Sequence, residues 1–300
     1  MVVIAERYMI TRQLFGIFAW LAAILAWPVA SVAQDAVLQD PTLVELTTGV
    51  PGHTGISFFD LVKQVIPDLA RNENGSIGHR TVTLRHIAGD GFGGSLPDPI
   101  KIGVLRALLF ESEGKPRIAM LLDVGKIDDL GEQPALLAVF DAAGRMPTLL
   151  DAVDIGLDRV TSLAEPALVR IGERDHAILT TSQHFNSAEN YTWTALIFLR
   201  GGKLSLIDKF LAYNAHTCPL RKTQAFSFDG EPGENNAPYY EVTVTMSDEG
   251  TLPEEDCYDI AVGTPYARSV SATYRWDADE ARFVADSDAV ERLQEETGER

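Results

Sequence analysis

The chain has 300 residues, of which 46% are hydrophobic, and its formal net charge is -18. This composition is ordinary for a globular protein, and its strong negative charge disfavours nucleic acid and anionic lipid surfaces as partners. The length is sufficient for one large domain or two small ones.

Residues 1–33 predict a secretory signal peptide. Arg7 and Arg12 supply a positive start, residues 14–27 are almost wholly apolar, and residues 31–33 form a small-x-small cleavage site. The apolar stretch is shorter than the roughly 20 residues that span a bilayer. We therefore expect an exported protein, periplasmic or secreted, with no membrane association after cleavage. An uncleaved N-terminal anchor is the alternative.

Residues 34–79 predict an N-terminal segment that contains one helix, over residues 57–66. Ser57 can cap this helix, and Asp60 stands three residues later, as in a capping box. Pro67 ends it, because proline cannot continue the hydrogen-bond ladder. An apolar stripe indicates the face that the helix buries, formed by Phe58, Leu61, Val62 and Val65.

Residues 80–285 predict an antiparallel β domain made of short strands separated by turn residues. The strands are expected at residues 81–87, 100–110, 117–124, 135–141, 148–155, 167–171, 176–185, 191–200, 203–212, 224–228, 239–246, 268–276 and 282–285. The strand at residues 191–200 is apolar on both faces, which is typical of a central strand. Gly201 and Gly202 suit the tight turn that follows it.

These elements indicate a mainly β fold. We expect an antiparallel two-sheet sandwich or open barrel, with the N-terminal helix packed on it. Residues 286–300 predict a short acidic C-terminal helix or tail. The alternative is a partial propeller-like repeat, since residues 100–155 and 167–212 each have about the length of a propeller blade.

The chain has two cysteines, Cys218 and Cys257. Export would place them in an oxidising compartment, so we predict that they form one disulfide. A redox pair is disfavoured because the spacing is not Cys-x-x-Cys.

No motif of a known catalytic or cofactor site withstands physical inspection. Residues 89–94 match the letters Gly-x-Gly-x-x-Gly, but Pro97 and Pro99 follow, and the dinucleotide fingerprint requires a helix there. Ser95 lacks the final glycine and the helix of a nucleophile elbow. The histidines show no chelating spacing. We therefore expect no cofactor, no transition-metal site and no readable enzyme centre.

Calcium is the one ion that the sequence leaves open. Asp151, Asp154 and Asp158 could offer hard oxygen ligands, although their spacing departs from the calcium-loop pattern. Solvated turn carboxylates are the simpler interpretation.

The segment from His184 to Tyr191 is the strongest candidate for ligand binding. It joins two apolar strands through a turn that gathers an imidazole, amides and a phenol, and we name His184, Asn186, Asn190 and Tyr191 as candidate ligand residues. Polar loops held by rigid strands can bind a protein, peptide or glycan ligand. The alternative is that the asparagines only satisfy the turn backbone.

The sequence therefore favours a non-enzymatic, exported binding or interaction module. Two alternatives stay open: an exported hydrolase acting on an envelope polymer with carboxylates recruited across strands, and a structural envelope component. A buried carboxylate with a raised pKa in a cleft would favour the hydrolase.

Overall fold

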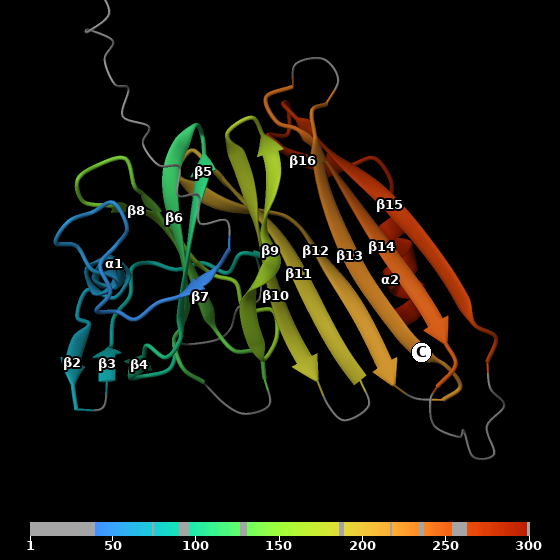
Figure 1. Ribbon diagram of the computed structural model, residues 1–300, viewed down its shortest axis with the longest axis horizontal. Coiled ribbons are helices and arrows are strands. Elements are labelled where there is room, and N and C mark those ends of the chain that lie inside the picture. Colours follow the sequence, from blue (N-terminus) through green and yellow to red (C-terminus); the bar gives the residue numbers. More distant parts are fainter. Residues whose placement is uncertain are drawn as a thin grey trace, which may run out of the picture. The chain divides into compact units, whose positions relative to one another are not determined.

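The computed structural model describes residues 40–73, 75–89, 96–126, 131–185, 189–216, 218–233, 237–253 and 263–298. They form a mainly β structure with three antiparallel sheets and two short helices, which confirms the predicted fold class (Figure 1). The described residues all belong to one compact unit, Val37–Arg300.

The first sheet has five strands in the order β1-β5-β6-β7-β8. Its strands are β1 (Thr42–Leu43), β5 (Leu105–Ser112), β6 (Lys115–Asp123), β7 (Ala135–Asp141) and β8 (Thr148–Asp154). The centres of β6 and β7 are buried on both faces. This explains why their sequences are continuous apolar runs rather than alternating patterns.

The second sheet is an eight-stranded meander in which every strand pairs with its neighbours in the chain. Its strands are β9 (Val160–Gly172), β10 (Asp175–Phe185), β11 (Glu189–Arg200), β12 (Lys203–His216), β13 (Arg221–Glu231), β14 (Glu241–Thr251), β15 (Tyr266–Asp277) and β16 (Arg282–Ala285). Gly201 and Gly202 have φ angles of 57° and 72°, as the tight turn between β11 and β12 requires.

The two sheets face each other across a shared apolar core, which makes the sandwich. Leu108 and Leu137 of the five-stranded sheet belong to the same buried cluster as Ile178 and Ile197 of the eight-stranded sheet. Strand β11 also buries its opposite face, through Phe198 in a second cluster. The prediction that this strand is central is therefore confirmed.

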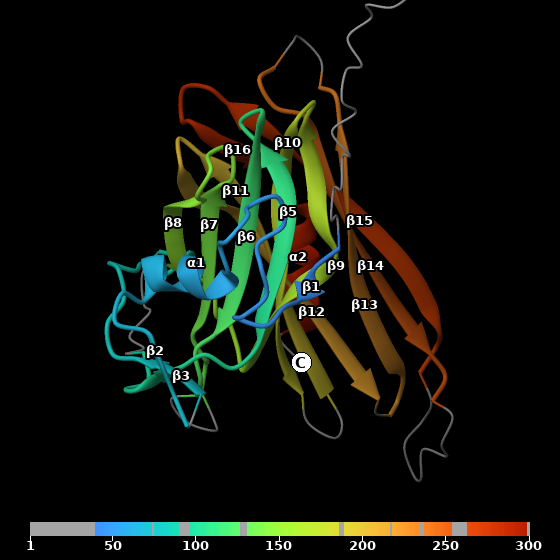
Figure 2. The same ribbon diagram turned by 60° about the vertical axis from the view of Figure 1, so that its left-hand side comes forward.

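Helix α1 (Phe58–Val65) covers the other face of the five-stranded sheet, and Figure 2 shows it lying across these strands. The backbone N–H and the hydroxyl of Ser57 both donate to the carboxylate of Asp60, at 2.8 and 2.6 Å. The hydroxyl first, and then the backbone N–H, lower the pKa of Asp60. The predicted helix start is thus confirmed. Its apolar stripe of Phe58, Leu61, Val62 and Val65 is buried as expected.

Helix α2 (Ala289–Gly298) packs against the other face of the eight-stranded sheet. Val290 and Leu293 join a cluster of aromatic side chains that includes Phe198 and Phe210.

The eight-stranded sheet also bends back on itself, because the N–H of Tyr240 donates to the carbonyl of Ile171 at 2.7 Å. A sandwich with a strongly coiled second sheet therefore combines the two architectures expected from sequence. The described residues do not form the four-stranded blades of a propeller.

The strand predicted at residues 81–87 is wrong. The structure has there only an isolated bridge between His86 and Asp154, at one end of β8. At the other end of β8, the side chain of Gln64 accepts from the N–H of Leu149 and donates to the carbonyl of Pro147. Because these edge groups are already engaged, residues 81–87 cannot pair along the whole strand.

A small third sheet was not expected from the sequence. It consists of β2 (Ala70–Asn72), β3 (Gly75–Gly78) and β4 (Ile100–Lys101), in that order. The pairing of β3 with β4 joins residues on either side of the predicted boundary at residue 80.

Several expectations fall outside the described residues. These are the signal peptide at residues 1–33, most of the glycine-rich loop at 89–94, and Cys257. The disulfide between Cys218 and Cys257 therefore stays a prediction. No helix in the described part of the chain is both long and apolar enough to cross a membrane.

Candidate functional site

The geometry of the strands divides the predicted ligand residues between two faces. His184 of β10 pairs with Tyr191 of β11, whereas Asn190 pairs with Phe185. Because neighbouring residues of a strand point to opposite faces, Asn190 and Tyr191 cannot present their side chains to one ligand on one face. Asn186 lies outside the described residues. The structure therefore brings His184 and Tyr191 together and separates Asn190 from them.

His184 and Tyr191 belong to a row of rings that runs across three strands. The ring centroids of His184 and Tyr191 are 6.2 Å apart, and those of Tyr191 and Tyr213 are 5.0 Å apart. Both phenols donate to the carboxylate of Glu189, at 3.3 and 2.9 Å. Burial and then the bond to Glu189 raise the pKa of Tyr213 to about 12. Both phenol groups thus already donate their hydrogen bonds to Glu189. The Nδ1 atom of His184 lies 3.3 Å from Oδ1 of Asp158.

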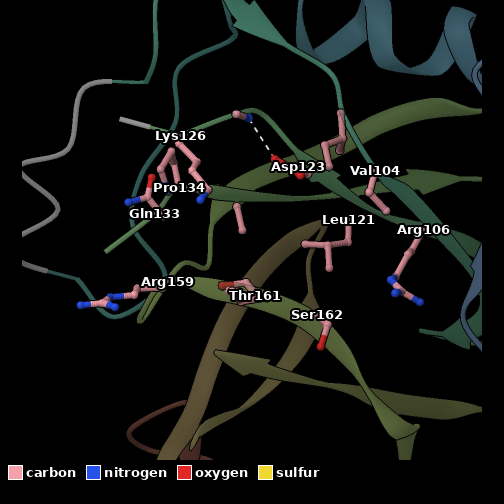
Figure 3. A pocket seen from close by; sticks show the side chains of 14 residues that line it. Val104, Arg106, Leu121, Asp123, Lys126, Gln133, Pro134, Arg159, Thr161 and Ser162 are labelled. Atoms are coloured by element: carbon pink, nitrogen blue, oxygen red, sulfur yellow. Dashed lines mark hydrogen bonds between the residues drawn. The ribbon is translucent and has the colours of Figure 1, made fainter. Parts of the chain in front are cut away.

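A pocket of about 260 Å³ lies where the start of β5, the end of β6 and the start of β7 meet the start of β9 (Figure 3). We call it the corner pocket. Its apolar lining comes from Val104, Leu121, Leu122, Pro134, Ala135 and Val160. Val104 and Val160 are exposed, at 45% and 51%, so the apolar lining continues to the mouth. This is the kind of concave, partly apolar surface that binds small molecules.

Three cationic side chains line the same pocket. They are Arg106 from β5, Lys126 from the segment after β6, and Arg159 from the segment before β9. Figure 3 shows Arg106 at one end and Arg159 and Lys126 towards the other, with Leu121 between them. Among the described residues, Asp123 is the only acid in the lining, and its Oδ1 accepts the N–H of Gly125 at 2.9 Å.

The hydroxyl groups of the pocket are already engaged in the sheet. Thr161 lies 2.8 Å from Ser182, and Ser162 lies 3.0 Å from Thr181, both between side-chain oxygens. The hydroxyl of Ser182 also accepts the N–H of Leu157 at 3.2 Å. These contacts fix the wall that β9 forms.

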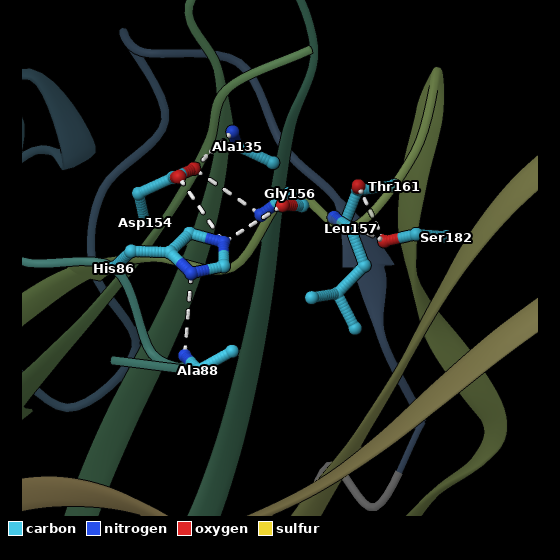
Figure 4. A network of polar contacts seen from close by, with 8 residues as sticks. All are labelled: His86, Ala88, Ala135, Asp154, Gly156, Leu157, Thr161 and Ser182. Atoms are coloured by element: carbon cyan, nitrogen blue, oxygen red, sulfur yellow. Dashed lines mark hydrogen bonds and ion pairs between the residues drawn. The ribbon is translucent and has the colours of Figure 1, made fainter. Parts of the chain in front are cut away.

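Figure 4 shows a carboxylate and an imidazole, those of Asp154 and His86, on the opposite side of Gly156 from Thr161 and Ser182. Asp154 is 1% exposed, and its Oδ1 accepts the N–H groups of Ala135 and Gly156 at 2.9 and 3.2 Å. Burial raises the pKa of Asp154 to about 6, although these two bonds oppose the shift. The Nε2 atom of His86 lies 3.7 Å from Oδ2 of Asp154 and 2.9 Å from the carbonyl of Gly156.

Both ring nitrogens of His86 face backbone groups. The imidazole Nδ1 faces the N–H of Ala88 at 3.3 Å, so it accepts, and Nε2 donates toward Gly156. Figure 4 shows Ser182 beside Leu157 and Thr161, on the side away from His86. Neither Asp154 nor His86 lines the corner pocket. Asp154 therefore has the raised pKa expected of a catalytic carboxylate, but it does not line the pocket.

The three aspartates considered for calcium take separate partners. Asp151 binds Arg85 at 2.7 Å and Lys203 at 3.0 Å, while Asp154 and Asp158 have the contacts described above. Among the residues that the structure describes, no three His, Cys, Asp or Glu side chains are placed to hold a metal ion. The calcium interpretation thus gains no support from the geometry.

Sequence reasoning missed the corner pocket and Arg106. The available signal was a charged residue two positions before Leu108, within the expected strand at residues 100–110, where the alternation calls for an apolar side chain. Lys126 and Arg159 carried no comparable signal, because they lie in connecting segments that only the fold brings together.

Comparisons with known proteins do not relate this chain to a known family. No family model, no curated protein and no solved structure matches the chain.

Proposed function

We propose that this chain is an exported binding protein whose corner pocket takes a small, partly apolar ligand. The observation that carries the proposal is the pocket itself, an apolar hollow with cationic side chains at the junction of the two sheets. Its volume of about 260 Å³ is slightly below the range of drug-sized sites, so the ligand is a small molecule rather than a polymer segment. Export rests on residues 1–33 of the sequence.

The position of the pocket supports a binding role. Part of its wall is the start of strand β9, where side-chain hydrogen bonds such as that between Thr161 and Ser182 hold the strand in place. Rigid walls reduce the ordering that a ligand must impose, which favours affinity. The hydrolase alternative lacks such support, because burial raises the pKa of both Asp154 and Asp175, and both carboxylates lie outside the pocket lining.

Binding can be tested with two six-carbon probes, hexanoate and hexanamide, by saturation-transfer NMR and calorimetry. Val160→Trp places a large side chain at the pocket mouth and should abolish binding of any probe that enters. Met146→Trp is the matched control, since Met146 is also exposed, at 47%, and lies outside the pocket lining. Binding that Val160→Trp removes and Met146→Trp preserves supports the proposal. Binding that both variants leave unchanged, or no binding of either probe, overturns it.

A further inference from the structure

Arg106 occupies a position on the inner face of the five-stranded sheet. In strand β5 it alternates with Leu108 and Phe110, which both lie in the core between the two sheets. Its cross-strand partner on β6 is Leu121, also a member of this core. Residues directly opposite each other in an antiparallel pair share a face. The sheet therefore points Arg106 toward the eight-stranded sheet, at the end where the corner pocket opens.

This arginine has no partner within the described structure. The residue is half-buried, yet its guanidinium makes no hydrogen bond or ion pair with any of the described residues. Arg117, which lies on β6, is by contrast paired with both Glu113 and Asp141, at 3.2 and 2.7 Å. A guanidinium that is partly removed from water gains from a carboxylate partner, because the two groups form parallel charge-assisted hydrogen bonds.

The described lining of the pocket differs in charge from the chain as a whole. It contains three cations, Arg106, Lys126 and Arg159, and one acid, Asp123, while the whole chain carries -18. The protein as a whole therefore repels anions, and this hollow is a place where one can be held.

We propose that the corner pocket selects a ligand that bears a carboxylate, which Arg106 binds. The apolar body of the ligand lies along Leu121 and Val160, and its far end reaches toward Gln133 and Arg159. This inference rests on the proposed function and adds the chemical class of the ligand.

The test compares hexanoate with hexanamide at pH 7, since the two share a chain and differ in charge. On the unaltered protein, hexanoate should bind about tenfold more tightly than hexanamide, as expected for one charge-assisted pair in a partly desolvated site. Raising the salt concentration should weaken hexanoate binding and leave hexanamide binding nearly unchanged.

Substitutions of Arg106 test whether this residue causes the preference for hexanoate over hexanamide. Arg106→Met keeps a long side chain suited to the core edge and should reduce hexanoate affinity to that of hexanamide. Arg106→Lys should keep part of the preference, because lysine retains the positive charge but lacks the two parallel N–H donors of the guanidinium. Arg145→Met, which removes an arginine outside the pocket lining, is the matched control and should keep the preference. Circular dichroism and thermal melting establish that each variant folds.

The possible outcomes separate the two proposals. If both probes bind equally, and Val160→Trp removes both, the binding function stands and the carboxylate inference is wrong. If hexanoate is preferred but Arg106→Met retains the preference, the assignment to Arg106 is wrong. If neither probe binds, both proposals fall.

Discussion

Two charged groups lie near the junction of the two sheets, and their surroundings differ. Asp154 is 1% exposed and receives two backbone N–H groups, with His86 beside it. Arg106 is half-buried, opens on the corner pocket and has no partner among the described residues. The carboxylate of Asp154 satisfies buried backbone donors of the fold, whereas a half-buried guanidinium without a partner is available to a ligand.

The largest expected effect comes from removing the carboxylate of Asp154. Asp154→Ala leaves the N–H groups of Ala135 and Gly156 without their acceptor inside the structure, and each such buried donor costs roughly 1–3 kcal/mol. We expect the free energy of unfolding to fall by about 2–5 kcal/mol, measured by urea denaturation at pH 7. Asp154→Asn is the matched control, since its side-chain carbonyl can still accept both bonds. A loss below about 1 kcal/mol in Asp154→Ala would contradict the structural role.

The second prediction concerns the pH dependence of stability. The pKa of Asp154 is about 6 in the folded protein and 3.8 ordinarily, so the folded state binds this proton more tightly than the unfolded state. The stabilisation is fully present below pH 3.8 and is lost as the pH rises through 6, by up to about 3 kcal/mol. The free energy of unfolding of the unaltered protein minus that of Asp154→Asn should therefore fall as the pH rises over this range, as urea titrations from pH 4 to 7.5 can show. A difference that does not vary with pH would show that the folded pKa is not raised.

The third prediction uses Asp60, a carboxylate held at the start of α1. Asp60→Ala removes the acceptor of both Ser57 donors and should lower the free energy of unfolding by about 1 kcal/mol. Here the pKa is lowered, so the stabilisation is present at neutral pH and is lost as the pH falls through the folded pKa. Urea denaturation at pH 7 and at pH 3 measures this pH dependence, whose sign is opposite to that expected for Asp154. Lys63→Ala, on the same helix, should show no comparable dependence on acid.

The smallest expected effect is that of Arg106→Met on stability. Because Arg106 has no partner to lose within the described residues, we expect a change within about 0.5 kcal/mol in either direction by urea denaturation. A loss above about 1.5 kcal/mol would mean that Arg106 supports the fold, and the contrast with Asp154 would then fail.

Much of the β structure could be predicted from the sequence because it depends on local patterns. The run of apolar residues at 135–141 and the alternation at 282–285 reproduce the bounds of β7 and β16. The prediction at residues 81–87 failed because an alternating pattern does not show whether a pairing edge is free. Gln64 and the end of β8 decided that instead.

The candidate site was much less accessible to such reasoning. His184 and Tyr191 are close in sequence, and a hairpin brings them together, so their pairing could be anticipated. That Asn190 faces the other way follows from the register of the same hairpin. The corner pocket is formed by residues of β5, β6, β7 and β9 together with their connecting segments. No local sequence pattern shows that these strands come into contact.

The sequence by itself determined the mainly β class, the capped helix α1, the central position of β11 and the Gly201–Gly202 turn. Each depends on periodicity or on backbone geometry within a few residues. Only the tertiary structure decided that Arg106 lines a pocket while Asp154 is buried outside the pocket lining. The physical reason is that burial and charge pairing depend on which distant strands come into contact, and a residue's own neighbours in the chain do not determine that.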